Sequence, residues 1–232
     1  MNNISIMLEN NKIYKASDFS DMSSETIFNF EYSKIERNNM YILSEHIINS
    51  TTIEAVLQNH DKGKIVALNF ANAIIPGGAY IIGGNAQEES ICRASMLYYS
   101  IRKQRKYYLK NILHLSPAYT DTMIYSENVP IIRDDSGRLL ENPVHCNFIT
   151  CPAVNRTLAR FIIPEKKIIK IMERRINKII SFAMSKSPDL LILGAFGCGA
   201  FGNNRETIFQ IFENSINSYI DEKSDIIFAV PQ

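Results

Sequence analysis

Apolar residues at helical spacing predict the longest helix in the second half of the chain. Ile168, Met172 and Ile176 fall on one face of a helix that begins near Pro164 and ends before Pro188. The same kind of spacing predicts three further helices, over residues 51–57, 87 to about 104, and about 205–220.

Short apolar runs predict the strands. The three clearest cover residues 64–70, which include β-branched residues, 190–193 and 225–230. Shorter candidates lie at 112–117, 123–126 and 148–149, and a turn is predicted at 134–137. Because strands and helices alternate while the middle strands are short and irregular, the pattern predicts an α/β fold with helices on both faces of a mixed sheet.

The domain organisation follows from the same pattern. Residues 1–43 are rich in Asn, Ser and Met and show no clean periodicity, so we expect an N-terminal arm or accessory helices there. Residues 44–232 contain no linker and no internal repeat, which predicts a single globular domain there. The whole chain of 232 residues, 46% of them hydrophobic, is long enough to bury one sizeable core.

Charge and composition narrow the function classes. A net charge of +1 leaves no electrostatic footprint for duplex nucleic acid, and we expect the basic clusters at 102–106 and 166–175 to be solvated helix faces. The chain shows neither a signal peptide nor a membrane-spanning run, so we expect a soluble, cytoplasmic protein. We also expect a monomer. Its four cysteines and four histidines lack metal-ligand spacing, which predicts reduced thiols, no metal and no cofactor.

Two glycine-bearing loops carry the candidate chemistry. The first covers residues 69–79 and contains Pro76-Gly77-Gly78-Ala79, and the second covers residues 194–203. Each follows a predicted strand, and such turns can bring backbone N–H groups close to a phosphate. Together with two nearby glutamates, the loops suggest an enzyme that acts on a phosphate-bearing, sugar-linked substrate.

The second loop matches the dinucleotide fingerprint by letter. Gly197, Gly199 and Gly202 have the spacing, and Glu222 follows 20 residues later. That fingerprint normally opens a Rossmann unit, yet only about 30 residues remain here, so we reject it. A diphosphate site and a tight structural turn both stay open. Cys198 is a poor candidate nucleophile, because a nucleophile elbow needs a small residue where Phe196 stands.

The first loop leads into Gln87-Glu88-Glu89 on a predicted helix. Neighbouring helix residues project about 100° apart, so Glu88 and Glu89 cannot do the same task at one point. One can hold a substrate while the other does acid–base work. The alternative is a pair of exposed glutamates that merely favour the helix N-terminus.

These segments resemble one enzyme family. The stretch NFANAIIPGGAYIIGGNAQEESICRASMLY is similar to the signature of microbial-type poly(ADP-ribose) glycohydrolases, in which a glycine triplet precedes Gln-Glu-Glu. The stretches PIIRDDSGRLLENPVHCNFITCP and LILGAFGCGAFGNN resemble later blocks of that family. The resemblance runs from about residue 45 to the C-terminus, and the N-terminal arm adds nothing to it.

The resemblance implies a fold and a set of roles. The fold would be a three-layer α/β/α macrodomain-like sandwich with ADP-ribose in a cleft at strand ends. Glu89 would be the general acid that protonates the leaving oxygen and then activates water, and Glu88 would bind ribose hydroxyls. Gln87 would set the loop and Asn72 would contact the distal ribose. The remaining ligand contacts implied are Gly77 and Gly78, near the diphosphate and that ribose, and the second loop around the diphosphate (Gly197, Cys198, Gly199, Ala200, Phe201 and Gly202), with Phe201 on the ribose.

One departure from the family pattern bears on activity. Ala79 replaces the third glycine, which is harmless at negative φ and costly at positive φ or close substrate approach. The leading hypothesis is metal-independent hydrolysis of ribose–ribose bonds in poly(ADP-ribose), releasing ADP-ribose. Two alternatives stay open: a reader that binds ADP-ribose with little catalysis, and a hydrolase that removes a single ADP-ribose from an ADP-ribosylated protein or nucleic acid.

Overall fold

A seven-stranded sheet forms the centre of the molecule in the computed structural model, which describes residues 2–30, 34, 40–219 and 224–231. The strand order is β1-β4-β5-β3-β6-β7-β2. The strands are β1 (Ser23–Ile27), β2 (Ile47–Ile48), β3 (Ile65–Phe70), β4 (Met123–Arg133), β5 (Leu139–Cys151), β6 (Leu190–Leu193) and β7 (Asp225–Ala229). The α-helices are α1 (Asn3–Ala16), α2 (Thr52–Gln58), α3 (Gln87–Ala94), α4 (Leu97–Ile101), α5 (Arg105–Leu113), α6 (Arg156–Ala159), α7 (Glu165–Ser185) and α8 (Arg205–Tyr219), with short 3₁₀ turns η1 (Leu43–His46) and η2 (Tyr80–Ile82).

The sheet is mixed. Strands β5, β3, β6, β7 and β2 run parallel to their neighbours in that order, whereas β4 pairs antiparallel with both β1 and β5. Because parallel strands end at the same edge of a sheet, the chain leaves β3, β5, β6 and β7 on one side of the molecule, the side at which α/β proteins bind ligands.

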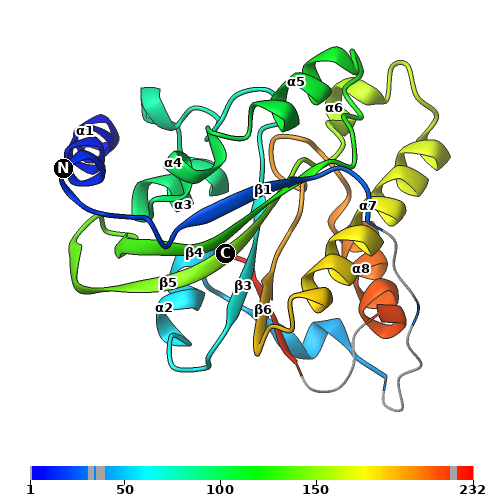
Figure 1. Cartoon of the computed structure of the whole chain (residues 1–232). Coiled ribbons are helices and arrows are strands. Elements are labelled where there is room, and N and C mark those ends of the chain that lie inside the picture. The colour runs from blue at the N-terminus through cyan, green and yellow to red at the C-terminus, as the bar shows by residue number, and fades with distance from the viewer. Residues whose placement is uncertain (1, 31–33, 35–39, 220–223, 232) are drawn as a thin grey trace.

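Side chains alternate between two cores, one on each face of the sheet. On β3, Val66 and Leu68 join the core that contains α7 and α8, while Ile65 and Ala67 join the core beneath α2, α3, α4 and α5. Figure 1 shows α7 and α8 on one side of the sheet and α1, α3 and α4 on the other. This is the predicted three-layer α/β/α architecture with a mixed sheet.

Several predicted elements are confirmed with small shifts. The helices over α2, α7 and α8 and the strands β3, β6 and β7 lie where the apolar pattern places them. Thr51 caps α2, since its hydroxyl accepts the N–H of Glu54 at 3.0 Å. The predicted turn closes the β4–β5 hairpin, with the N–H of Gly137 donating to the carbonyl of Asp134 at 2.9 Å. The predicted end of the last helix at Ile220 lies outside the described residues.

Other predictions are wrong. Residues 112–117 do not form a strand. Ile112 and Leu113 are the last two residues of α5, whose buried face is made by Tyr107, Tyr108 and Asn111, and the rest follow the helix. The single helix predicted over 87–104 is two helices, because Ser95 forms an antiparallel bridge to Ile131 and interrupts the helical hydrogen bonding. The strands predicted at 123–126 and 148–149 are confirmed, but as parts of the much longer hairpin strands β4 and β5.

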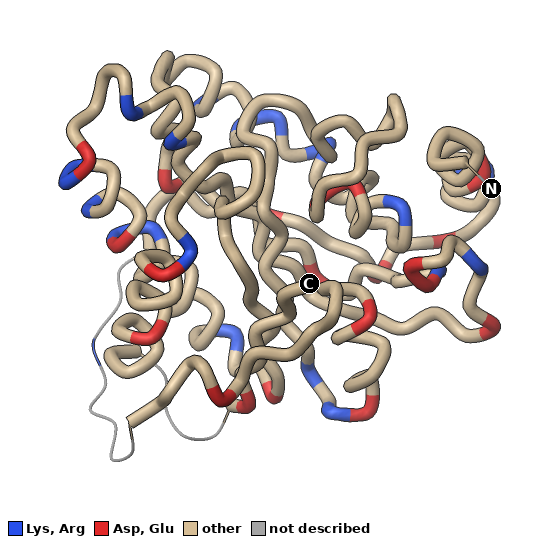
Figure 2. Tube along the Cα trace, turned by 180° about the vertical axis from the view of Figure 1, so that it is seen from behind, with Lys and Arg blue, Asp and Glu red and all other residues tan. Residues whose placement is uncertain are grey.

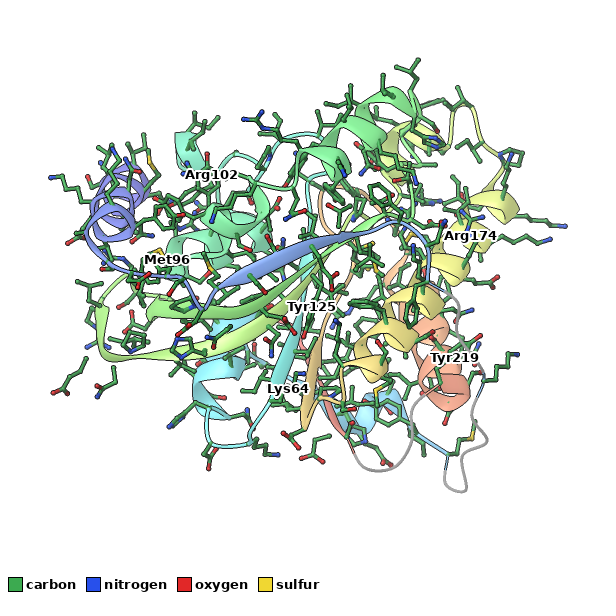
Figure 3. The ribbon with its side chains drawn as sticks, in the orientation of Figure 1. Lys64, Met96, Arg102, Tyr125, Arg174 and Tyr219 are labelled. Atoms are coloured by element: carbon green, nitrogen blue, oxygen red, sulfur yellow. The ribbon has the colours of Figure 1, made fainter. Side chains whose placement is uncertain are left out.

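The N-terminal segment and the basic clusters also depart in part from expectation. Residues 23–27 form β1, an edge strand beside β4 that the sequence pattern did not indicate. Figure 2 shows Lys and Arg interspersed with Asp and Glu along the trace. Arg102 and Arg105 are exposed, as expected. Arg175 instead lies fully buried, while its neighbour Arg174 remains 61% exposed on α7 (Figure 3).

The buried Arg175 fastens the segments around it to α7. Its guanidinium donates to the carbonyls of Pro152 and Ala118, both at 2.8 Å, and to the carboxylate of Asp121 at 3.0 Å. These contacts satisfy a charge that could not otherwise be buried. They hold the chain that leaves β5 at the carboxyl edge of the sheet.

Candidate active site

A cleft of about 470 Å³ opens at the carboxyl edge of the parallel strands. Phe70, Ala153, Ala195 and Ala229, which lie at or just beyond the ends of β3, β5, β6 and β7, contribute to its walls. The rest comes from the starts of α2 and α3, the second glycine loop and the β4–β5 turn. The volume suits a ligand of nucleotide size.

Gln87 joins α3 to the end of β3. Its side-chain oxygen accepts the N–H of Phe70 at 2.8 Å, and its amide group donates to the carbonyl of Leu68 at 2.8 Å and to the hydroxyl of Thr52 at 3.0 Å. The side chain thus satisfies one backbone donor and one backbone acceptor at the end of β3 and fixes where α3 begins. Gln87 also lines the cleft.

Glu89 is buried, with one oxygen held and one unused. Its Oε1 accepts the backbone N–H of Ala79 at 2.8 Å. Its Oε2 is buried and accepts no hydrogen bond from the described part of the chain. A buried carboxylate oxygen without a partner is costly in a stable fold and is a common sign of a functional group. This position excludes the alternative of an exposed glutamate that merely favours the helix N-terminus.

Glu88 is buried as well, but both of its oxygens are engaged. Oε2 accepts the N–H of Asn72 at 2.7 Å and Oε1 accepts the side-chain amide of Asn69 at 3.3 Å. Burial raises the pKa of Glu88 to about 8, against the lowering effect of these hydrogen bonds. Glu88 thereby ties the chain after β3 to α3, and its predicted contact with ribose hydroxyls stays a prediction.

The first glycine loop closes around the two carboxylates. Gly77 and Gly78 are buried and have φ of +69° and +56°, a region that favours glycine. A methyl group added to Gly78 would lie 2.4 Å from Oε1 of Glu89. The loop therefore needs glycine at both positions to hold Glu89.

Ala79 and Asn72 complete that loop. Ala79 has φ of −90°, so an alanine is unstrained there, and its N–H is the donor to Glu89. The side-chain oxygen of Asn72 accepts the N–H groups of Ile74 and Ile75, both at 2.9 Å, and so forms a turn. The predicted contact of Asn72 with ribose stays a prediction.

The second glycine loop presents backbone donors to the cleft. Gly197, Gly199, Ala200 and Phe201 all line it. Within the described chain, the N–H groups of Gly199, Ala200 and Phe201 donate to no protein group. A methyl group at Gly199 would meet nothing within 4 Å, so the fold does not demand glycine there and the space is open to a ligand. Consecutive free N–H groups form an anion-binding concavity.

Three other residues that the sequence analysis named with this loop are not part of the cleft wall that the structure describes. Gly202 has φ of +68° and packs against the hydroxyl of Thr157, where it acts in the turn and not in the cleft wall. Cys198 is half-buried, and burial raises the pKa of its thiol to about 11, which leaves it protonated and supports its rejection as a nucleophile. Glu222 lies outside the described residues.

Two site residues escaped the sequence analysis. Asn69 begins the first glycine loop in the sequence, but no local pattern indicates that its side chain contacts Glu88. Asp135 was read as part of a turn, yet it reaches the cleft wall and accepts a hydrogen bond from Thr51, 84 positions away in sequence. No local pattern could have indicated that pairing. Among the described residues, no group of three or more His, Cys, Asp or Glu is placed to hold a metal ion.

Comparison with known proteins places this site in context. A family model described as the catalytic domain of microbial-type PARG matches residues 1–134, which include the first glycine loop and both glutamates. The match also includes residues 1–43, which the sequence analysis left outside the resemblance. The comparison with curated proteins gives no match.

Solved structures of bacterial enzymes are similar over most of the chain. Poly(ADP-ribose) glycohydrolase from Deinococcus radiodurans, solved in complex with ADP-ribose, is 35% identical with a TM-score of 0.72, over 80% of this chain and 76% of that one. The enzyme from Thermomonospora curvata, solved with the inhibitor ADP-HPD, is 26% identical with a TM-score of 0.81, over 98% of this chain and 92% of that one.

Proposed function

Because the chain belongs to the microbial-type poly(ADP-ribose) glycohydrolase family, we propose that Glu89 carries out its glycosidic hydrolysis. The chain is a hydrolase of the glycosidase type, with poly(ADP-ribose) as its substrate and ADP-ribose as its product. The observation that carries the assignment is the buried, unpartnered Oε2 of Glu89 beside a glycine loop.

The proposed reaction uses one carboxyl group twice. Protonated Glu89 gives its proton to the oxygen that leaves the anomeric carbon, and the bond between that carbon and oxygen breaks with an oxocarbenium-like transition state. The resulting carboxylate then takes a proton from the water that attacks the same carbon, which restores the acid. Glu88 is less suited to this task, because protein groups occupy both of its oxygens.

The cleft supplies the complementary contacts for the substrate. The free N–H groups of Gly199, Ala200 and Phe201 would hold the diphosphate, in keeping with a site for anions built from backbone donors. Gly77 and Gly78 would keep Glu89 in position for the sugar, because a side chain at Gly78 would displace the Glu89 carboxylate. Cys198 and Gly202 would shape the loop from behind.

The conformation of the first loop favours an enzyme over a reader without activity. Ala79 adopts a φ open to any residue and gives its N–H to Glu89. The replacement of the third glycine therefore keeps the hydrogen bond that positions the proposed acid.

Several wider features belong to the same proposal. Residues 44–232 would form the catalytic domain, with residues 1–43 as an accessory arm, and the protein would work as a monomer without a metal. The described helices are all too short or too polar to cross a membrane. A cytoplasmic location is supported by the free, buried thiols of Cys92, Cys146 and Cys151, which fit a reducing compartment.

Product analysis tests the proposed function. Purified protein, incubated with poly(ADP-ribose) and a chelator, should release free ADP-ribose. Intact polymer together with measurable ADP-ribose binding would instead show a reader. Release of ADP-ribose from mono-modified protein but not from polymer would show a hydrolase of single modifications.

A further inference from the structure

A patch of exposed apolar side chains lies beside the second glycine loop. Leu158, Phe161 and Ile162, at the end of α6 and just after it, are 56%, 74% and 68% exposed. Single exposed apolar residues are normal on a protein surface, but three within five positions form a patch that the core does not use. Together with Arg160 they form a surface that we call the α6 platform.

The α6 platform is fastened to the loop that carries the free backbone donors. The N–H of Thr157 donates to the carbonyl of Phe201 at 3.1 Å, and the hydroxyl of Thr157 donates to the carbonyl of Ala200 at 3.3 Å. The guanidinium of Arg156 donates to the carbonyl of Gly202 at 3.1 Å. Because α6 contributes no residue to the cleft wall, the platform lies outside the cleft, next to this loop.

Two arginines of this segment have different surroundings. Arg156 is committed to the fold, since its Nε also donates to the carboxylate of Glu165 at 2.8 Å. The guanidinium of Arg160 lies over the ring of Phe161, 5.0 Å from the ring centroid, and pairs with no carboxylate among the described residues. An exposed ring backed by a free guanidinium is a surface on which a nucleic-acid base can stack.

The surroundings of the α6 platform are basic. The N–H of Asn155 donates to the carbonyl of Pro117 at 2.9 Å, which joins the segment before α6 to the segment after α5. Residues 102–115, which include α5, carry five Lys and Arg, all exposed, and no Asp or Glu. Lys166 and Lys167 are exposed at the start of α7. Positive charge beside a stacking surface suits a single-stranded polyanion that carries bases.

The proposed reaction leaves part of its substrate outside the cleft. When a ribose–ribose bond of poly(ADP-ribose) breaks, the oxygen that leaves belongs to the adenosine of the neighbouring unit. That unit therefore carries an adenine one sugar away from the broken bond, and a diphosphate after it. Because the second loop would hold the diphosphate of the unit inside the cleft, the bond to be broken lies one sugar beyond that loop, close to α6.

We infer that the α6 platform binds the polymer unit on the leaving side of the bond, with the adenine stacked on Phe161 and Arg160 and the diphosphate facing the basic residues nearby. This inference rests on the proposed function, since it takes poly(ADP-ribose) as the ligand. A polymer is favoured over an anionic membrane surface, because the platform adjoins the loop that would hold the neighbouring diphosphate.

Steady-state release of ADP-ribose from the polymer, together with calorimetric titration of free ADP-ribose, tests the site. Phe161→Ala and Phe161→Leu should each lower kcat/KM for the polymer about tenfold, mainly by raising KM, because the adenine loses the ring on which it stacks. Phe161→Tyr keeps a ring and should match wild type. The Kd for ADP-ribose, which fills the cleft alone, should not change in any of the three.

Two further variants separate stacking from general surface effects. Leu8→Ala is the matched control: Leu8 is 53% exposed on α1, which lies on the opposite side of the molecule from α6 (Figure 1), and this variant should match wild type. Arg160→Gln should make KM for the polymer less dependent on salt concentration, because it removes one charge that meets phosphate. Thermal unfolding of every variant would show that each is folded.

Several results would overturn the inference. An unchanged kcat/KM for the polymer in folded Phe161→Ala would remove the site but leave the proposed function intact, since ADP-ribose would still be released. A weaker Kd for free ADP-ribose in Phe161→Ala would place the ring in the cleft site instead. Binding of wild type to phosphatidylserine vesicles, lost in Phe161→Ala with unchanged polymer kinetics, would assign the platform to a membrane surface. Absence of ADP-ribose release by wild type would overturn the proposed function as well.

Discussion

At the residue scale, two adjacent glutamates of one helix turn have different hydrogen-bond partners, although both are buried. Glu88 is enclosed by protein groups that take both oxygens, and burial raises its pKa to about 8. Glu89 is held by one N–H and keeps a free oxygen. The sequence showed that the two could not share a task, but it could not show which was free, because that depends on where Ala79 and Asn72 place their N–H groups.

The buried Glu88 predicts a specific dependence of stability on pH. Between its ordinary pKa of 4.5 and its folded value of about 8, the folded protein holds a proton that the unfolded chain has lost. The stability contributed by neutral Glu88 is therefore complete below about pH 4.5 and disappears as the pH rises through 8. Glu88→Gln removes this titration.

Denaturant unfolding at pH 5, 6.5 and 8 measures the effect. The free energy of unfolding of wild-type protein should fall by a few kcal/mol relative to Glu88→Gln between pH 5 and pH 8. Glu206→Gln, which alters an exposed first-turn glutamate of α8, should run parallel to wild type. Parallel curves for wild type and Glu88→Gln would refute the shifted pKa.

At the element scale, the segment from Gly77 to the start of α3 is shaped by small residues at close approach. A methyl group at Gly84 would lie 2.6 Å from Cβ of Ala79 and 3.2 Å from Cγ of Glu89. The alanine that departs from the family pattern is therefore accommodated by a glycine five positions later. The sequence placed the loop correctly and raised the question of Ala79, but it could not reveal its packing partner.

A double-mutant cycle tests this packing. Gly84→Ala should destabilise the protein by about 1–3 kcal/mol, because the two methyl groups overlap. Ala79→Gly should recover part of that loss when combined with Gly84→Ala, giving a coupling energy of about 0.5–3 kcal/mol. Thermal unfolding of the four proteins gives the values, and additive effects would contradict the predicted overlap.

At the scale of the whole molecule, the cleft is assembled from segments that the sequence alone could locate only in part. Periodicity predicted the strands β3, β6 and β7 and both glycine loops, since each is a local pattern. It missed β1, which is recognisable only through its pairing with β4. It also predicted a strand at the end of α5, because Ile112 and Leu113 are apolar although they are exposed. The hydrogen bond between Thr51 and Asp135 crosses 84 positions and could come only from the fold.

The central claim is that this assembly makes Glu89 the acid of a glycohydrolase. The most direct measurement compares ADP-ribose release from poly(ADP-ribose) and ADP-ribose affinity in wild type, Glu89→Gln and Glu206→Gln. Glu89→Gln should lower kcat by about 10²- to 10⁴-fold while its Kd for ADP-ribose changes little, and Glu206→Gln should match wild type in both. Near-normal release by a folded, binding-competent Glu89→Gln would contradict the account and would direct attention to Glu88.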